Sequence, residues 1–532
     1  MCEELKIENK LRLSSIIKTK FNNNKVLLLK SVLFTFILGF IAHGYMYFNN
    51  ALSLDALAEW ADSNRVIKWK IGLGRPFLVL YHFIFRGNMI LPFFTGLLSL
   101  LWTSLAVFFV CKLFSLKSYL QVFLVSCIFT LNLTFIVMTC AFLNDIDGNL
   151  FAMFLSVLAV YLWRRSKFGY LYAIIPITFS LGIYQSYVSV TIFLVLIISA
   201  MDLLYGKTAK QVFLSGLKAL VAVLISALTY FVSLKVVCSI FDVELKDDMS
   251  YNSMGNLKYL TPVRALKLTA WACVYIVKRL LMPTSLLPTV IVCTLNVIIF
   301  LLAGISLVLY LVKNKLKAKE LLLLFTLICL MPVATVISTV ASLGVIREYM
   351  HYSVCLFYLF ALLLLRLNFG EFKKEKVNFI FKLLKPIACG IMAFILLSNV
   401  VTSNTAYTVK VFEKDANLSF MTRVISDIEK VEGYKVGETK IAFIGYPENS
   451  IVASSEYDEI KKVWGMQYDF FMTGHEWYYN AYFELYLMYP GKIATNLERD
   501  NLSALEEVVN MPVYPNGEGI KMINGYVVVK LG

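Results

Sequence analysis

Long apolar runs recur along most of this chain, and they restrict its fold more than any other feature. Between Val26 and Thr402, runs of about 18 or more mostly apolar residues follow one another, and each can cross about 30 Å of hydrocarbon as a helix. Because 59% of the 532 residues are hydrophobic and only 16% are charged, a water-soluble globule is excluded. The sequence therefore predicts a polytopic α-helical membrane protein with about 11 spanning helices.

Polar or basic residues separate the apolar runs and define the expected spans to within several residues. The expected spans are Val26–Phe48, Met89–Cys111, Tyr119–Phe142, Asn149–Trp163, Phe168–Gln185, Tyr187–Leu204, Lys218–Phe241, Leu287–Val312, Leu321–Val340, Tyr352–Leu367 and Leu384–Val401. The two runs on either side of Gln185 could instead be one helix that is broken at the outer face.

Basic connectors alternate along the chain and predict its orientation. The segments Arg164–Lys167, Lys313–Lys319 and Lys373–Lys385 are rich in Lys and Arg, which places them and the N-terminus in the cytoplasm. The C-terminus is then expected outside. The same loops account for most of the net charge of +15, so we expect no nucleic-acid partner.

The spans divide the chain into three parts. Residues 1–25 form a basic cytoplasmic tail, residues 26–402 a membrane domain, and residues 403–532 a small extracytoplasmic α/β domain. Helical periodicity over Leu418–Val431 and strand patterns over Lys440–Tyr446 and Tyr526–Leu531 indicate the α/β class. Two further outer loops, residues 49–88 and 242–286, are longer or more polar than a connection requires, so function is expected in these three outer segments.

The first outer loop contains two patterns suited to chemistry. Asp55, Glu59 and Asp62 are spaced so that they share one face of a helix, where a carboxylate could act as a base or simply contact solvent. Further on, Gly72–Pro76 reads GLGRP, in which the glycines allow close backbone approach and Arg75 suits a phosphate group. An ordinary turn with an interfacial arginine explains the second pattern about as well.

Two later patterns suit the binding of sugar hydroxyls. Asp145 and Asp147, separated by one residue, would point the same way in an extended loop and could hold a divalent cation or hydroxyl groups, or merely cap a short loop. Tyr184 and Gln185 interrupt an apolar region with an amide and a hydroxyl. Aromatic residues also gather at membrane interfaces for structural reasons alone.

Cations in the second half of the chain could meet phosphate groups. The segment Thr261–Leu281 begins with a helix-start signal and has an apolar centre too short to span, flanked by Arg264, Lys278 and Arg279. It is expected to lie at the membrane interface, where any anionic lipid could bind. Arg347 is a further cation, which could instead pair internally with Glu348 next to it.

Several of these features occur in an order that resembles the Gtr-type, serotype-converting glucosyltransferases, polytopic enzymes of the GT-C superfamily. The resemblance covers nearly the whole chain, although each motif alone is loose. The landmarks are Asp55, Gly74-Arg75, Asp147, the sequence GIYQSY over Gly182–Tyr187, and two terminal segments, Met511–Pro515 and Gly525–Leu531.

The resemblance implies transfer of a sugar, usually glucose, from undecaprenyl phosphate to a surface polysaccharide on the outer leaflet of a bacterial plasma membrane. It implies partners as well: a donor synthase on the cytoplasmic side and a flippase. Asp55 would be the general base, with Glu59 as the alternative, and direct attack would invert the anomeric centre. Metal participation stays open.

The remaining candidate residues divide by role under the same resemblance. The expected donor-phosphate residues are Arg75, Arg264, Lys278, Arg279 and Arg347. The expected sugar-binding residues are Asp145, Asp147, Tyr184 and Gln185. A flippase or exporter of lipid-linked sugars, or a polysaccharide polymerase, is the competing hypothesis, because each would also bind a polyprenyl phosphate.

Overall fold

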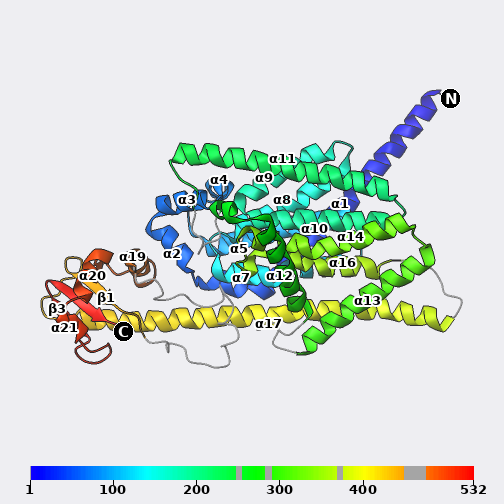
Figure 1. Cartoon of the computed structure of the whole chain (residues 1–532). Coiled ribbons are helices and arrows are strands. Elements are labelled where there is room, and N and C mark those ends of the chain that lie inside the picture. The colour runs from blue at the N-terminus through cyan, green and yellow to red at the C-terminus, as the bar shows by residue number, and fades with distance from the viewer. Residues whose placement is uncertain (1, 247–253, 282–289, 368–374, 448–474) are drawn as a thin grey trace.

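A body of long, roughly aligned helices makes up most of the molecule, and a smaller unit with a β-sheet lies at one end of it (Figure 1). The computed structural model describes residues 2–246, 254–281, 290–367, 375–447 and 475–532. The C-terminus lies in the sheet unit, whereas the N-terminal helix extends from the opposite end of the body.

The helical body is formed by the following elements in chain order: α1 (Cys2–Asn49), α2 (Leu54–Ala61), α3 (Ser63–Gly72), α4 (Pro76–Phe85), α5 (Pro92–Leu113), α6 (Tyr119–Thr130), α7 (Leu133–Ala141), α8 (Ile146–Arg165), α9 (Gly169–Ile183), η1 (Gln185–Tyr187), α10 (Val188–Leu204), α11 (Ala209–Phe241), η2 (Met254–Tyr259), α12 (Pro262–Leu281), α13 (Val290–Asn314), α14 (Ala318–Thr335), α15 (Ile337–Ala341), η3 (Glu348–Met350), η4 (Tyr352–Cys355), α16 (Leu356–Leu365) and α17 (Glu375–Ile428).

The prediction of a helical membrane protein is confirmed, but helix length supports fewer spans than eleven. Within the described residues, eight helices are long and apolar enough to cross a membrane, or nine if the bent pair α6–α7 is one span. That pair bends by 42° between Thr130, where α6 ends, and Asn132, which caps α7 by accepting a hydrogen bond from the backbone N–H of Phe135. The expected spans Phe168–Gln185 and Tyr352–Leu367 form apolar helical segments shorter than 18 residues. Part of the expected span Leu287–Val312 lies outside the described residues.

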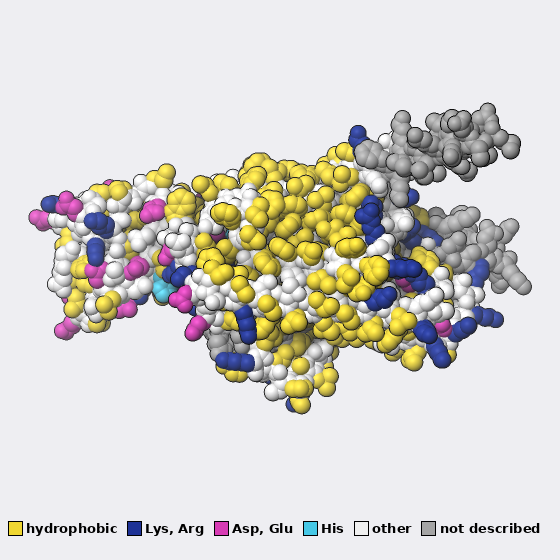
Figure 2. Space-filling view, turned by 90° about the horizontal axis from the view of Figure 1, so that it is seen from above, with side chains coloured by type: hydrophobic (Ala, Val, Ile, Leu, Met, Phe, Trp, Pro, Cys, Tyr) yellow, Lys and Arg dark blue, Asp and Glu magenta, His cyan; other side chains and the backbone are white. Residues whose placement is uncertain are grey.

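The surface of the helical body matches a lipid environment. Figure 2 shows hydrophobic side chains covering the middle of the molecule, including the outward faces of α4 and α11, where Phe83 is 81% and Ile240 72% exposed. Many Lys and Arg side chains gather at the end far from the sheet unit, as in the connectors around Arg165 and Lys315. An apolar belt between polar ends is what a bilayer requires of a helical bundle.

The last long helix joins the body to the sheet unit without a break. α17 continues past the expected domain boundary at residue 403 as far as Ile428 (Figure 1). Its final turns bury Met421, Val424, Ile425 and Ile428 against the sheet, at the i, i+3, i+4 and i+7 spacing of one helical face. The same helix therefore serves as expected span and as part of the C-terminal core.

The sheet unit has four strands in the order β2-β1-β4-β3. The predicted strands are present as β1 (Lys440–Ile444) and β4 (Tyr526–Lys530), which pair in parallel, with Lys440 opposite Tyr526. β2 (Lys492–Ile493) adds in parallel to β1, and β3 (Ile520–Ile523) is antiparallel to β4. The remaining elements of the unit are α19 (Glu476–Tyr482), η6 (Phe483–Leu487), α20 (Asn496–Ser503) and α21 (Glu506–Val509).

Candidate functional site

A cavity of about 900 Å³ lies where the first outer loop, two spans and the sheet unit meet. α2 and α3 line it together with the residues just before α8 and just after α11, and the sheet unit contributes Trp477. Its charged lining residues are Asp55, Arg65, Lys68, Lys70, Arg75, Asp145, Asp242, Glu244 and Lys246. The cavity therefore brings together three of the predicted site residues, Asp55, Arg75 and Asp145.

The three acids of the first outer loop are placed in three different environments. Asp55, in the first turn of α2, is exposed and lines the cavity. Glu59, one turn later, is buried. Asp62 falls beyond the end of α2 and caps α3, where its side chain accepts a hydrogen bond from the backbone N–H of Arg65 at 2.9 Å. The predicted shared face is thus divided, because α2 ends at Ala61.

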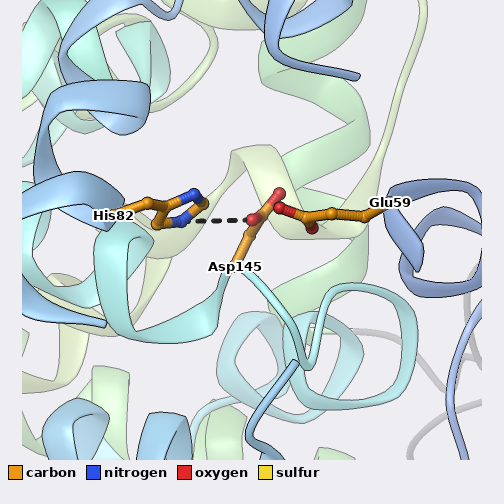
Figure 3. Close-up of side chains that lie close together, drawn as sticks. All are labelled: Glu59, His82 and Asp145. Atoms are coloured by element: carbon orange, nitrogen blue, oxygen red, sulfur yellow. Dashed lines mark ion pairs between the residues drawn. The ribbon is translucent and has the colours of Figure 1, made fainter. Parts of the chain in front are cut away.

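A buried ion network joins α2, α3 and the N-terminal end of α8. Lys70 Nζ lies 3.0 Å from Glu59 Oε1 and 2.9 Å from Asp145 Oδ1. The other oxygen of Glu59 accepts a hydrogen bond from Asn144 Nδ2 at 2.6 Å. Figure 3 shows Glu59 and His82 approaching Asp145 from opposite sides. Both oxygens of Glu59 are thus engaged, one by Lys70 and the other by Asn144.

Arg86 connects the network to the fully buried Asp147. Its Nε lies 3.3 Å from Asp147 Oδ2, and its Nη2 lies 3.8 Å from Asp145 Oδ1 and also contacts the carbonyl oxygen of Asn144. His82 Nε2 lies 2.9 Å from Arg86 Nη2 and 3.3 Å from Asp145 Oδ1, so its tautomer decides which of them it pairs with. Asp147 is fully buried and lies behind the cavity wall rather than in it.

The network keeps its charges because they compensate one another. Burial alone would lower the pKa of Lys70, but the carboxylates of Asp145 and Glu59 outweigh it and raise that pKa above its usual value. Burial alone would raise the pKa of Asp145, but Lys70, His82 and Arg86 together lower it. Lys70 is therefore an ammonium ion and Asp145 a carboxylate at neutral pH.

The same cluster does not fit a divalent cation. Glu59, His82 and Asp145 each offer a ligand atom, and these atoms lie within 4.8 Å of one another. The Lys70 ammonium already binds one oxygen of each acid, and Arg86 lies near the same Asp145 oxygen. Two cations beside the donor set repel a metal ion and occupy its ligands. Among the described residues this cluster is therefore better explained as an ion network.

Arg75 is held at the cavity by the glycine-rich turn. Gly74 adopts a positive φ of 84°, and Gly72 packs so tightly against residues 244–246 that a Cβ would lie 3.2 Å from the carbonyl oxygen of Glu244. The Arg75 guanidinium lies 4.7 Å from the centre of the Tyr184 ring. Gln185 donates from its amide to the carbonyl oxygen of Gly74.

Tyr184 and Gln185 are thus beside the cavity rather than in its lining. Tyr230 of α11 reinforces the turn, donating from its hydroxyl to the carbonyl oxygen of Gly74 at 2.7 Å, and Gln185 Nε2 lies 2.9 Å from the same hydroxyl. These contacts give the two predicted sugar-binding residues a positioning role toward Arg75. Direct sugar contact by either residue stays a prediction.

The predicted cations of α12, and Arg347 just before η3, do not line this cavity. Arg279 is buried and forms an ion pair with Glu348, which also accepts a hydrogen bond from Tyr275 at 3.0 Å. Lys278 is exposed and Arg264 half-exposed on the same helix. Arg347 is half-buried next to the ion-paired Glu348. Phosphate binding by these four residues stays a prediction.

Sequence reasoning missed several residues that build the site. Lys70, His82, Arg86 and Asn144 complete the network, and Trp69 and Trp477 line the cavity. Lys70 and Trp69 lie within five residues of the GLGRP motif, and Asn144 directly precedes the predicted residue Asp145. His82 and Arg86 lie one turn apart at the end of a short apolar helix. Two polar side chains at this spacing in an apolar segment were the sequence feature that could have indicated a buried polar site.

A bundle of apolar helices with a charged cavity at one end of its spans defines a polytopic membrane protein with an enzyme-like site. A family model described as glucosyl transferase GtrII matches residues 44–365, more than half of the chain. The chain belongs to this family and is a membrane glycosyltransferase. No curated protein and no solved structure matches it significantly. The matched residues include the cavity-lining first outer loop and end within α16, before α17 and the sheet unit.

Proposed function

We propose that this chain transfers a sugar from a polyprenyl phosphate to a cell-surface polysaccharide on the outer leaflet of a bacterial plasma membrane. Glucose is the sugar to test first. The observation that supports this proposal most is that Asp55 and Arg75, an acid and a cation assigned to the two ends of one reaction, line one cavity. That cavity lies at the ends of α8 and α11 far from the basic connectors, where the positive-inside rule places the outer face.

Asp55 is the proposed general base. The acceptor hydroxyl attacks the anomeric carbon of the donor sugar while Asp55 takes its proton, so a carbon–oxygen bond forms as the carbon–oxygen bond to phosphate breaks. The electron pair of the broken bond leaves with the polyprenyl phosphate. A phosphate monoester is a good leaving group, so no acid partner is required, and a single displacement inverts the anomeric configuration.

Glu59 is a weaker candidate for the base. Its oxygens accept hydrogen bonds from Lys70 at 3.0 Å and from Asn144 at 2.6 Å, and its side chain is buried. A base needs a lone pair that can reach the acceptor hydroxyl. Asp55 is exposed and lines the cavity, so an acceptor hydroxyl in the cavity can reach its side chain.

Arg75 is the proposed phosphate residue. Its guanidinium can donate two parallel hydrogen bonds to phosphate oxygens and offset the charge that develops as the bond breaks. Arg65, Lys68 and Lys246 line the same cavity and add to its positive potential. Asp145, whose side chain is fixed by Lys70, is the predicted sugar-binding residue that reaches the lining.

The decisive experiment measures release of labelled glucose from undecaprenyl-phosphate glucose by the purified full chain with cell-envelope polysaccharide. Asp55→Asn should lower the transfer rate by about 10²- to 10⁴-fold, the usual contribution of a general base. Asp62→Asn is the matched control, because Asp62 caps α3 instead of lining the cavity, and it should retain most activity.

Three results would change the proposal. A folded wild type that binds the lipid without transferring its sugar would favour a flippase or a different sugar. An active Asp55→Asn variant would remove Asp55 as the base. A product with retained anomeric configuration would remove the single displacement.

A further inference from the structure

Two tryptophan side chains line the cavity without belonging to the ion network. Trp69 comes from α3 and is 38% exposed, and Trp477 comes from α19 and is half-buried. Each has a cation near its ring face: Arg65 lies 5.2 Å from the Trp477 ring centre, and Lys246 lies 5.1 Å from the Trp69 ring centre. The cavity thus combines charged groups with partly exposed aromatic faces.

On α19, Trp477 is less buried than the aromatic residues that follow it. Tyr478, Tyr479 and Tyr482 are buried in the hydrophobic cluster that joins α17, the sheet and α2. Trp477 lies on the side of the helix that lines the cavity. Trp477 packs against the edge of this cluster and its ring stacks on that of His475, yet it stays half-buried and presents part of its surface to the cavity.

α19 and η6 are fixed to the helix that carries Asp55. Leu57 of α2 belongs to the same cluster as Tyr478 and Tyr482, and Trp60 Nε1 donates to Glu484 Oε2 at 2.9 Å. Tyr486 accepts from the backbone N–H of Leu52 at 3.1 Å and donates to the carbonyl oxygen of Asn50 at 2.9 Å. The position of Trp477 is therefore tied to that of the proposed base.

We propose that Trp477, assisted by Trp69, forms the subsite that binds the acceptor saccharide. The inference rests on the proposed function, in which Asp55 deprotonates an acceptor hydroxyl. One face of a hexose ring carries several C–H groups, and an aromatic ring packs against that face while the hydroxyls at the ring edge contact the cavity's charged groups.

The acceptor fits this position better than the donor lipid does. Trp477 belongs to the sheet unit, which extends beyond the end of the helical body in Figure 1, whereas Arg75 lies in the turn from which α4 begins. A polymer in water can reach the cavity from the side of the sheet unit, and a polyprenyl phosphate must reach it from the bilayer.

The test compares Trp477→Ala, Trp477→Phe and wild type in the full chain, with KM and kcat measured separately for undecaprenyl-phosphate glucose and for polysaccharide from the cells that make the protein. Trp477→Ala should raise the KM for polysaccharide by about tenfold, the loss expected for one stacking contact. The KM for the donor should stay unchanged, and Trp477→Phe should recover most of the acceptor affinity. Trp271→Ala is the control, because Trp271 is 51% exposed on α12, outside the cavity lining.

A second measurement separates this inference from the proposed function. Binding of fluorescently labelled polysaccharide fragments to the solubilised protein needs no turnover, so it reports on the subsite even if the wild type transfers no glucose. Binding lost in Trp477→Ala and kept in Trp477→Phe supports the subsite. Equal binding by all variants, or a raised KM for the donor in place of the acceptor, overturns it.

Discussion

The cations of the first outer loop and those of α12 differ in how the fold uses them, although the sequence predicted phosphate-binding cations in both: Arg75 in the loop, and Arg264, Lys278 and Arg279 on α12. In the first outer loop, Lys70 is buried between carboxylates from two other elements, and Arg75 is fixed at the rim of a large cavity. On α12, Lys278 is exposed to solvent and Arg279 is neutralised by Glu348. The cations proposed to act in the reaction are thus those that lie where several elements converge on a cavity.

Burial explains why the first group is so closely organised. A buried ammonium ion is stable only if carboxylates and hydrogen bonds replace its water, so Lys70 fixes α2, α3 and the residues before α8 relative to one another. Asp55 lies one helical turn from Glu59 on α2. The network therefore helps to hold the proposed base in place, and two of its members, Lys70 and Asp145, also line the cavity.

The largest expected effect comes from Lys70→Met. Removing the ammonium leaves two buried carboxylates without their shared partner, which should destabilise the protein by about 3–5 kcal/mol and abolish transfer. Thermal unfolding in detergent and the transfer assay measure both effects. Lys68→Met removes the same charge from the same helix at an exposed position and should leave the unfolding temperature nearly unchanged. An equally stable Lys70→Met variant would show that the network is dispensable.

A smaller effect, with a defined pH dependence, is expected for Asp145→Asn. The folded protein lowers the pKa of Asp145, so the carboxylate contributes stability above its unfolded pKa of about 3.9 and loses that contribution as pH falls through the folded value. The free energy of unfolding of the wild type should exceed that of the variant by about 2 kcal/mol at pH 7. The difference in unfolding temperature should be constant from about pH 5 to 8 and shrink below about pH 4. A difference that grows on acidification would contradict the assigned charges.

The next largest effect is the loss of stability expected when the Arg279–Glu348 ion pair is broken. Arg279→Gln removes the positive partner of Glu348, leaves it only the hydrogen bond from Tyr275, and should lower the unfolding temperature. The double variant with Glu348→Gln should recover most of the loss. Transfer should recover in parallel. If Arg279 instead binds the donor phosphate, the double variant will be stable but its KM for the donor will remain high. That result would mean that α12, like the first outer loop, contributes a phosphate-binding cation.

Local patterns predicted much of the fold but only part of the site. Apolar runs and β-rich segments identify spans and the strands β1 and β4, because hydrophobicity and strand propensity are local properties. One expected span bends by 42° beside the helix-capping Asn132, and the neighbouring sequence does not indicate the size of this angle. Within the site, Lys68 and Lys70 look alike in sequence. Only the tertiary contacts with Glu59 of α2 and with Asp145, just before α8, show which of them is buried.

The smallest expected effect on the transfer rate is that of Lys278→Gln. Comparing it with Arg75→Gln tests directly whether the cations of α12 and of the first outer loop differ. Both variants remove one predicted phosphate cation. Arg75 lines the cavity and stacks on Tyr184, so its loss should lower the transfer rate by about 10²-fold or more. Lys278 is exposed in the last turn of α12, and its loss should change that rate by less than about twofold, as is usual for a solvated surface charge. Rates measured at two donor concentrations decide the matter, because a cation that contacts the phosphate must affect donor binding or the bond-breaking step. A strong effect of Lys278→Gln on either quantity would mean that α12 moves to the cavity during the reaction and that the two groups of cations act together.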